Sequence, residues 1–306
     1  MKNVLALAIL CVVATAVAGA QQGPRRAPDP RSMGGGDCRD NVYNCADTPN
    51  PLPAATTVWL EEMTWMDVRD ALKAGKTTAV VATGGMEPNG PWLVTGKHNY
   101  VLHANCEAIA RKLGNALCAP IVKFVPEGGI DPKTGHMTSP GTITAREETF
   151  QALLTDIAES LQAHGFKTIV FIGDSGGNQK GQAAVAEALT AKWAGKAVAL
   201  HIGEYYTYNV VTKHFEDSGK LPKDRKSDNM HDDPVITLNM FIDDPNSVRY
   251  DARVKAGKAT IDGVSIADRA KATALAKEIV AFRADYTIAA ITKALAAKGR
   301  GTAAPQ

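Results

Sequence analysis

The chain has 306 residues, of which 45% are hydrophobic and 22% charged, and its formal net charge is +2. A nearly neutral chain without a basic run in its central part lacks the electrostatic footprint of a nucleic-acid-binding protein. Its length and apolar content are sufficient for one large globular domain.

The N-terminus has the pattern of a secretory signal peptide. Residues 1–20, MKNVLALAILCVVATAVAGA, combine a charged start, a short apolar stretch and a small-x-small end. The stretch is short for a membrane span, although an uncleaved anchor is the alternative interpretation. We therefore expect a periplasmic or secreted protein that has no membrane contact once the signal is cleaved.

The next segment differs in composition from the rest of the chain. Residues 21–55 are rich in Pro, Gly, Arg, Asn and Asp, which predicts a Pro/Gly-rich arm that buries little apolar surface. Residues 56–298 are expected to form the globular domain, and residues 299–306 a disordered tail.

The cysteines fit an oxidising compartment. Cys11 would leave with the signal peptide, so four cysteines remain, and an even number permits disulfides. Cys38–Cys45 is the expected bridge because it closes a short polar loop. Cys106 and Cys118 fit buried thiols, and the sequence leaves their pairing open.

Apolar strands alternate with helical segments along the domain, which predicts a three-layer α/β/α fold around a mostly parallel sheet. The apolar periodicity places the elements as follows. In chain order they are a strand at 77–83, a helix at 100–114, an extended stretch at 116–125, a helix at 145–165, a strand at 167–173, a helix at 179–193, a strand at 197–206 and one or two helices over 265–298.

The segment 173–179, GDSGGNQ, raises the question of a nucleophilic serine. Its first five letters surround the reactive serine of trypsin-like proteases, but those enzymes are all-β, whereas here the motif lies between a strand and a helix. The same letters fit the Gly-x-Ser-x-Gly elbow of α/β-hydrolases. A serine hydrolase using Ser175, with His231 as base, is therefore a second hypothesis, although no Asp…His order follows the elbow.

Acidic and imidazole side chains follow several of the predicted strands. Because the carboxyl ends of parallel strands meet at one edge of a sheet, we expect these side chains to converge. Such a mixture of oxygen and nitrogen ligands suits a divalent metal. The residues concerned are Glu87, Asn89 and His98, then Glu127, Asp131 and His136, then Asp174 and Ser175, and finally Glu204, His231, Asp232 and Asp233.

Several of these residues also have a purely structural interpretation. Glu87 fits a solvated loop acid and His136 a residue that ties down a long loop. His98 fits a helix cap, as does Asp174, and the acids after His231 fit capping residues at a helix start. The metal hypothesis depends on their joint placement and not on any one of them.

Four segments together resemble the creatininase (creatinine amidohydrolase) family over residues 58–297. Residues 84–98, GGMEPNGPWLVTGKH, resemble its first signature, and 136–142, HMTSPGT, resemble its His followed by Pro-Gly-Thr. Residues 173–178, GDSGGN, resemble its Asn-Gly-His-Gly-Gly-Asn, and 231–237, HDDPVIT, resemble its His-Ala-Gly-x-x-Glu-Thr. The resemblance implies a creatininase-like fold and closed homo-oligomers, often hexamers.

The chain departs from the family pattern at the positions where that family binds a pair of divalent metals. Asn89 and Ser175 stand where the family has His, His98 where it has the bridging Asp, and Ile236 where it has a late Glu. Glu87 keeps its identity, and Asp174 stands beside Ser175. This pattern indicates a rearranged metal site, with one firmly held ion favoured over two.

The resemblance implies metal-assisted hydrolysis of an amide-type C–N bond in a small non-peptide substrate. We expect Zn or Mn, with Fe as an alternative, bound by Glu87, His98, Asp174 and Asp232. The expected catalytic residues are His231, for proton transfer to the leaving nitrogen, and His136, which would orient the substrate. The expected substrate contacts are Trp92, Asn89, Ser175 and Asp233. A non-catalytic periplasmic small-molecule-binding protein is the remaining alternative, because two family histidines are missing.

Overall fold

The computed structural model describes residues 26–33, 35–227 and 231–299. The chain divides into two compact units, one ending at Pro51 and one beginning at Leu52, and each is described by itself. The expected signal peptide lies outside the described residues, as do residues 300–306 of the expected tail. Within the described ranges, no helix combines the length and the apolar character needed to cross a membrane.

The first unit is a short segment closed by a disulfide. The bridge expected between Cys38 and Cys45 is present, and Ser32 pairs with Cys45 in an antiparallel bridge. A 3-10 turn, η1 (Val42–Asn44), follows Asn41, whose side chain caps it. Both cysteines are buried, so the disulfide lies at the centre of this otherwise polar segment.

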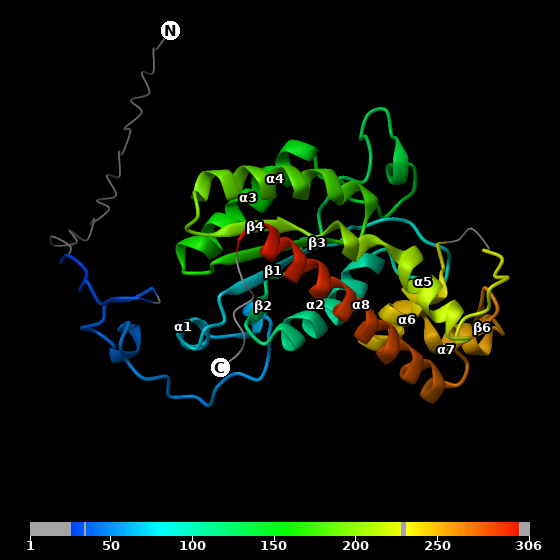
Figure 1. Ribbon diagram of the computed structural model, residues 1–306, viewed down its shortest axis with the longest axis horizontal. Helices are drawn as coiled ribbons and strands as arrows, with labels where there is room; N and C mark the ends of the chain where they lie inside the picture. Colours follow the sequence, from blue (N-terminus) through cyan, green and yellow to red (C-terminus); the bar gives the residue numbers. More distant parts are fainter. Residues whose placement is uncertain (1–25, 34, 228–230, 300–306) are drawn as a thin grey trace, which may run out of the picture. The chain divides into compact units, whose positions relative to one another are not determined.

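The second unit is built on a four-stranded parallel sheet with the order β2-β1-β3-β4 (Figure 1). The two central strands are buried almost throughout, as expected for a parallel sheet covered on both faces. The strands are β1 (Thr78–Thr83), β2 (Ala116–Cys118), β3 (Thr168–Gly173) and β4 (Val198–His201).

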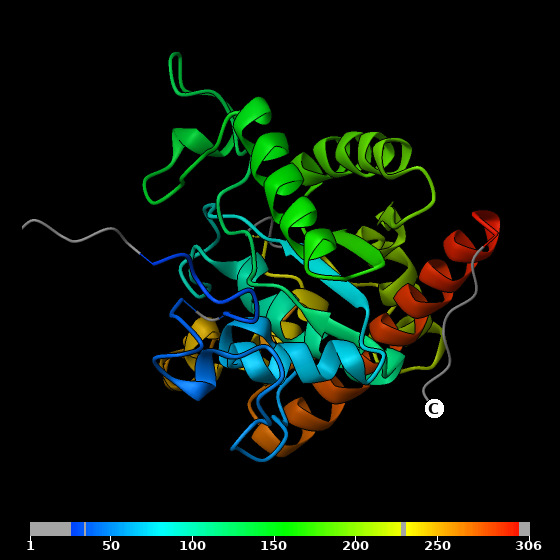
Figure 2. The same ribbon diagram turned by 90° about the vertical axis from the view of Figure 1, so that its left-hand side faces the viewer.

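Helices cover both faces of this sheet, which confirms the predicted three-layer α/β fold (Figures 1 and 2). One face carries α3 (Glu147–Ala163) and α4 (Gln179–Trp193). The other face carries α2 (Lys97–Leu113) and the long α8 (Arg269–Ala297). The short α1 (Trp65–Lys73) begins with a capping box formed by Thr64 and Asp67.

A second hydrophobic cluster extends the unit beyond the sheet. There α2, α6 and α8 contact one another, and the cluster buries side chains such as Phe215, Leu238, Phe241 and Ile279. The elements of this region are α5 (Tyr208–Asp217), α6 (Pro234–Asp243), α7 (Tyr250–Lys255) and the hairpin β5 (Thr260–Ile261) with β6 (Val264–Ser265). The 3-10 turns of the second unit are η2 (Leu60–Glu62), η3 (Gly135–Thr138), η4 (Gly176–Asn178), η5 (Gly203–Tyr206) and η6 (Pro245–Val248).

Several element boundaries differ from the expected ones. The stretch 116–125 is a strand only over β2, beyond which Val122 and Val125 form isolated bridges. The strand expected at 197–206 ends at His201, because η5 follows it. The C-terminal segment is one continuous helix. Cys106 and Cys118, which fitted buried thiols, are joined by a disulfide between α2 and β2.

The strand order creates a crevice at the carboxyl edge of the sheet. From β1 the chain crosses through α2 to β2 on one side, and from β3 it crosses through α4 to β4 on the other side. Open parallel sheets bind ligands where the direction of winding reverses in this way. A ligand site is therefore expected at the loops that follow β1 and β3.

Candidate active site

A buried imidazole connects the loops after β1 and β3. His98 lies in the first turn of α2, and its Nδ1 is 2.8 Å from Oδ2 of Asp174, the residue after β3. Its Nε2 is 3.1 Å from Oε1 of Glu87, which follows β1. Burial alone would lower the pKa of His98, but the two carboxylates raise it above the ordinary value.

Asp174 is fully buried and both of its oxygens have partners. In addition to His98, it accepts a hydrogen bond from the Tyr208 hydroxyl at 2.7 Å and contacts Nη2 of Arg283 at 3.1 Å. Arg283 comes from α8 and lies over the rings of Tyr205 and Tyr208. Although burial raises the pKa of Asp174, His98 and Arg283 together lower it, so the carboxyl group is ionised.

Glu87 faces several positively charged or imidazole groups at once. Lys97 Nζ lies 2.7 Å from its Oε1, and His136 Nδ1 lies 3.1 Å from its Oε2. Burial alone would raise the pKa of Glu87, but His98 and Lys97 outweigh it and hold this pKa well below its usual range. His231 lies farther away, with Nδ1 3.9 Å from Oε1 of Glu87.

A second buried glutamate completes a group of metal-donor atoms. Glu127 Oε2 is 2.9 Å from His136 Nδ1, while its Oε1 is buried without a hydrogen-bond partner. Burial and the nearby charge of Glu87 raise the pKa of Glu127. Ligand atoms of Glu87, Glu127 and His136 lie within 4.8 Å of one another.

The backbone permits this close approach because of a glycine. Gly85 has φ +153°, and a Cβ placed on it would lie 2.1 Å from Oε1 of Glu127. A larger residue at this position would push the Glu127 carboxylate away from Glu87.

The site borders a cavity of about 770 Å³, which is large enough for a small organic molecule. Most of the residues expected from the sequence meet there. They are Glu87, His98, His136, Asp174, Ser175, His231, Asp232 and Asp233, joined by Lys97, Tyr206, Tyr208 and Arg225.

The remaining expected residues have other positions or other partners. Trp92 and Asn89 do not line this cavity. The Trp92 ring lies under the guanidinium of Arg253, and the Asn89 side chain donates to the carbonyl oxygens of Glu87 and Val94. Their predicted substrate contacts stay predictions.

The acids after His231 are held by structural contacts. Asp232 is buried, with Oδ2 2.9 Å from Nη2 of Arg253 and Oδ1 accepting from Thr237 at 2.7 Å. The Asp233 side chain caps α6 by accepting hydrogen bonds from the backbone N–H groups of Val235 and Ile236, as the structural interpretation of the segment anticipated. The expected ligand role of Asp232 stays a prediction, although its oxygens already have partners.

Sequence reasoning did not carry forward Glu127 and Lys97 as site residues. In the sequence, Glu127 and Asp131 are both acidic residues that follow the same predicted strand. They differ in burial, which the sequence does not show: Glu127 is buried and Asp131 is exposed. Lys97 was hidden because α2 begins at Lys97, before the expected start at residue 100, and this places its side chain in the site.

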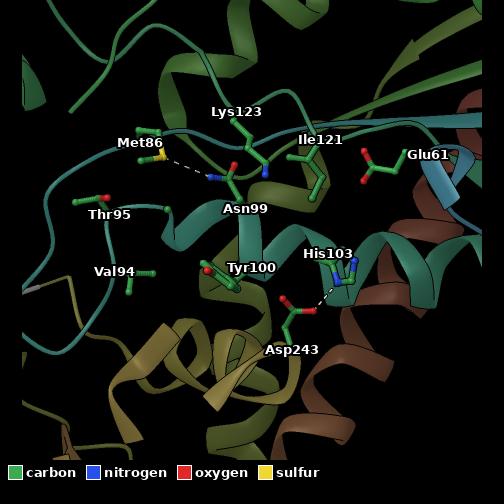
Figure 3. Close-up of a pocket in the computed structure, with 11 residues that line it drawn as sticks. Glu61, Met86, Val94, Thr95, Asn99, Tyr100, His103, Ile121, Lys123 and Asp243 are labelled. Atoms are coloured by element: carbon green, nitrogen blue, oxygen red, sulfur yellow. Dashed lines mark hydrogen bonds and ion pairs between the residues drawn. The ribbon is translucent and has the colours of Figure 1, made fainter. Parts of the chain in front are cut away.

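A second cavity, of about 440 Å³, lies beside the same loop (Figure 3). It is lined by the chain neighbours of the site residues, Met86 and Asn99, and by His103, whose Nδ1 is 2.5 Å from Oδ1 of Asp243. Of the metal-donor group, Glu87 and His136 line the first cavity, and none of its three residues is among those that line this one.

Comparison with known proteins identifies the family of the chain. The sequence model of the creatininase family, described as creatinine amidohydrolase, matches residues 61–303. A search of curated proteins gives no significant match.

Solved structures share the fold at low sequence identity. A structure titled "Creatininase Mn" is 18% identical, with a TM-score of 0.55 over 79% of this chain and 99% of that chain. A crystal structure of creatinine amidohydrolase (creatininase) is 20% identical, with a TM-score of 0.52 over 80% of this chain and 98% of its own. A mutant creatininase of Zn-Zn type is 19% identical, with a TM-score of 0.53 and coverages of 80% and 99%.

The family match extends over more than half of the chain, and the structural matches include its sheet and its flanking helices. The chain therefore belongs to the creatininase family.

Proposed function

We propose that this protein is a metal-dependent amidohydrolase that cleaves a C–N bond, of the amide or cyclic-amide type, in a small non-peptide substrate. The observation that carries the proposal is a group of metal-donor side chains at the carboxyl edge of the sheet, formed by the buried Glu87 and Glu127 and the half-buried His136. Glu87 and His136 line a cavity of about 770 Å³. Family membership supports the amidohydrolase class.

The donor atoms fit a divalent cation. Glu127 offers a buried Oε1 without a partner, Glu87 an ionised carboxylate and His136 an imidazole nitrogen. Two carboxylates and one imidazole suit Zn or Mn. These are the metals printed in the titles of two structural relatives. Such an ion would lower the pKa of a bound water toward neutrality and polarise the substrate carbonyl.

A residue of the chain itself, His231, is available for proton transfer. His231 lines the cavity with its side chain 58% exposed. The partial burial that remains and the charge of Lys97 lower its pKa. A neutral imidazole at working pH can accept a proton and then deliver it to the leaving nitrogen. Tyr206 and Asp233 line the same cavity and are available to orient a polar substrate.

The scale of the cavity favours a small substrate. A mutant creatininase with the same fold is titled as a complex with creatine, which is a small molecule. We propose a substrate of this size class for the present chain, with cyclic amides as the first compounds to test.

We also propose that the protein acts outside the cytoplasm. Support comes from the pairing of all four cysteines in the described residues, Cys38–Cys45 and Cys106–Cys118, because disulfides persist in oxidising compartments.

The test is metal content together with hydrolysis. We expect the mature protein, beginning at residue 21, to hold Zn or Mn and to hydrolyse at least one member of a cyclic-amide panel in a chelator-sensitive way. Glu127→Gln should weaken metal binding about 100-fold or more, since even partners outside the ligand set change metal affinity about 10–100-fold. Glu148→Gln, at an exposed position on α3, serves as the matched control.

Two results would contradict the proposal. One is wild-type protein that stays free of metal after reconstitution with Zn or Mn. The other is undiminished metal binding by Glu127→Gln. Metal binding without turnover on any substrate would favour the non-catalytic binding protein instead.

A further inference from the structure

The two oxygens of Glu87 face different partners. Oε1 lies 2.7 Å from Lys97 Nζ and 3.1 Å from His98 Nε2. Oε2 lies 3.1 Å from His136 Nδ1, which also contacts Glu127. The carboxylate therefore separates a lysine side, with Lys97 and His98, from a donor side, with His136 and Glu127.

The lysine side already contains a fixed positive charge. Only 4% of the Lys97 side chain is exposed, and its ammonium lies against a Glu87 carboxylate that is exposed to 3%. A buried charge is tolerated only when it is paired. Lys97 also lies in the first turn of α2, where the helix dipole disfavours a cation. The contact with Glu87 is therefore what holds the ammonium there.

The remaining buried acids around the site form a simple charge pattern. Asp174 pairs with Arg283 and Asp232 pairs with Arg253, as Glu87 pairs with Lys97. Glu127 has no lysine or arginine partner in the part of the chain that the structure describes. One carboxylate is thus left for an external cation, and it lies on the donor side.

A relative with this fold is titled as Zn-Zn type, which indicates two metal ions in that protein. We propose that in this chain the Lys97 ammonium replaces one of two cations, so that the site binds a single divalent ion on the donor side. This inference rests on the metal site proposed above and adds its stoichiometry and the residue that sets it.

The test is the number of metal ions bound per chain. Zn²⁺ is titrated into the apo form of the mature protein by calorimetry, and the bound metal is counted by elemental analysis after dialysis. We expect one equivalent for the wild type. Lys97→Met, which keeps most of the side-chain volume and removes the charge, should gain a second equivalent on the lysine side, with Glu87 Oε1 and His98 Nε2 as ligands.

Three further variants sharpen the result. Lys97→Arg keeps the charge and should remain at one equivalent. Lys192→Met removes an exposed lysine that pairs with Glu159 on the surface, and should also remain at one. Lys97→Met combined with Glu127→Gln should bind one equivalent, because only the lysine side remains. Circular dichroism melting establishes that each variant is folded.

The outcomes separate this inference from the proposed function. Two equivalents in the wild type or in Lys97→Arg overturn it, as does a single equivalent in folded Lys97→Met. One equivalent in both the wild type and Lys97→Met would be consistent with the hydrolase proposal but would show that Lys97 does not take the place of a second cation. No metal in the wild type would contradict both this inference, which requires one ion on the donor side, and the hydrolase proposal.

Discussion

His98 shows how a single residue can organise the site. Each of its ring nitrogens lies within 3.1 Å of a carboxylate oxygen, one from Glu87 and one from Asp174. The imidazole is buried, so its orientation is fixed by these two contacts and not by solvent. His98 therefore links the acid that follows β1 to the acid that follows β3.

Ser175 lies in a sequence motif that suggests a nucleophile, but its surroundings in the structure do not support this role. It is buried at the cavity wall, and its carbonyl oxygen accepts a hydrogen bond from Gln179. No histidine donates to or accepts from its hydroxyl among the described residues. A serine nucleophile needs an adjacent base within hydrogen-bond reach. His98, a buried histidine that lines the same cavity, has both ring nitrogens directed at acids.

We therefore predict that Ser175→Ala retains chelator-sensitive hydrolysis to within about 10-fold, since loss of a true nucleophile costs about 10⁴-fold or more. A serine-reactive phosphonate should leave the wild-type protein unlabelled, as measured by intact mass. Covalent labelling at Ser175, with activity that survives a chelator, would instead establish the serine-hydrolase hypothesis.

At the scale of elements, the site depends on how the ends of β1 and β3 are tied together. Asn178, at the start of α4, donates from its buried Nδ2 to the carbonyl oxygens of Thr83 and Gly84 at 2.9 Å each. Gln182, one turn later, donates to the hydroxyl of Thr83. These contacts hold the loop that carries Glu87 against the loop that carries Asp174.

We expect Asn178→Ala to lower the free energy of unfolding by about 2–3 kcal/mol, because a buried carbonyl left without a partner costs about 1–3 kcal/mol. Urea unfolding followed by circular dichroism measures this change. The control is Asn246→Ala at an exposed position, for which we expect a change within about 0.5 kcal/mol. Equal effects of the two substitutions would show that the Asn178 contacts do not stabilise the fold.

At the scale of the whole second unit, the two hydrophobic clusters are joined by polar contacts between distant segments. One such contact is the pair of His103 on α2 with Asp243 at the end of α6, seen at the edge of the second cavity in Figure 3. The hydrogen bond to Asp243 raises the pKa of His103 above 6.5, burial opposes this, and the charges of Glu107 and Glu62 add to the increase. The His103 ring also stacks on Trp59 at 4.7 Å.

This pair predicts a pH dependence of stability. Because the folded pKa of His103 is higher than the unfolded value, its contribution is fully present below about pH 6.5 and is lost as the pH rises through the folded pKa. We expect the wild type to have a higher free energy of unfolding than His103→Gln at pH 5.5. This difference between the two proteins should decrease by about 0.5 kcal/mol when the pH is raised to 8.5. The change is small because the His103 side chain is 41% exposed.

The measurement is urea unfolding of both proteins across this pH range. Asn246→Ala, at an exposed position that does not titrate, should show a difference from the wild type that is constant over this pH range. A His103→Gln difference that is constant with pH, or that increases as the pH rises, would contradict the assignment.

The alternation of strands and helices, and with it the three-layer fold, could be read from the sequence because apolar periodicity is a local property. The clustering of Glu87, His98, His136 and Asp174 could also be anticipated, because parallel strands place their carboxyl ends at one edge. The boundaries of β2 and α2 could not be predicted from the sequence, because packing and capping, and not periodicity, determine where an element ends.

What only the tertiary structure decided is which polar residues are buried against one another. Nothing near Asp174 in the sequence indicates that Arg283, from the last helix, lies 3.1 Å away. Likewise nothing in the loop after β2 distinguishes Glu127, which points inward past Gly85, from the exposed Asp131. The residue types determined the kind of chemistry available, whereas burial and long-range pairing determined which carboxylates have a cation of their own. Those interactions act between segments that are distant in the chain, so no local pattern encodes them.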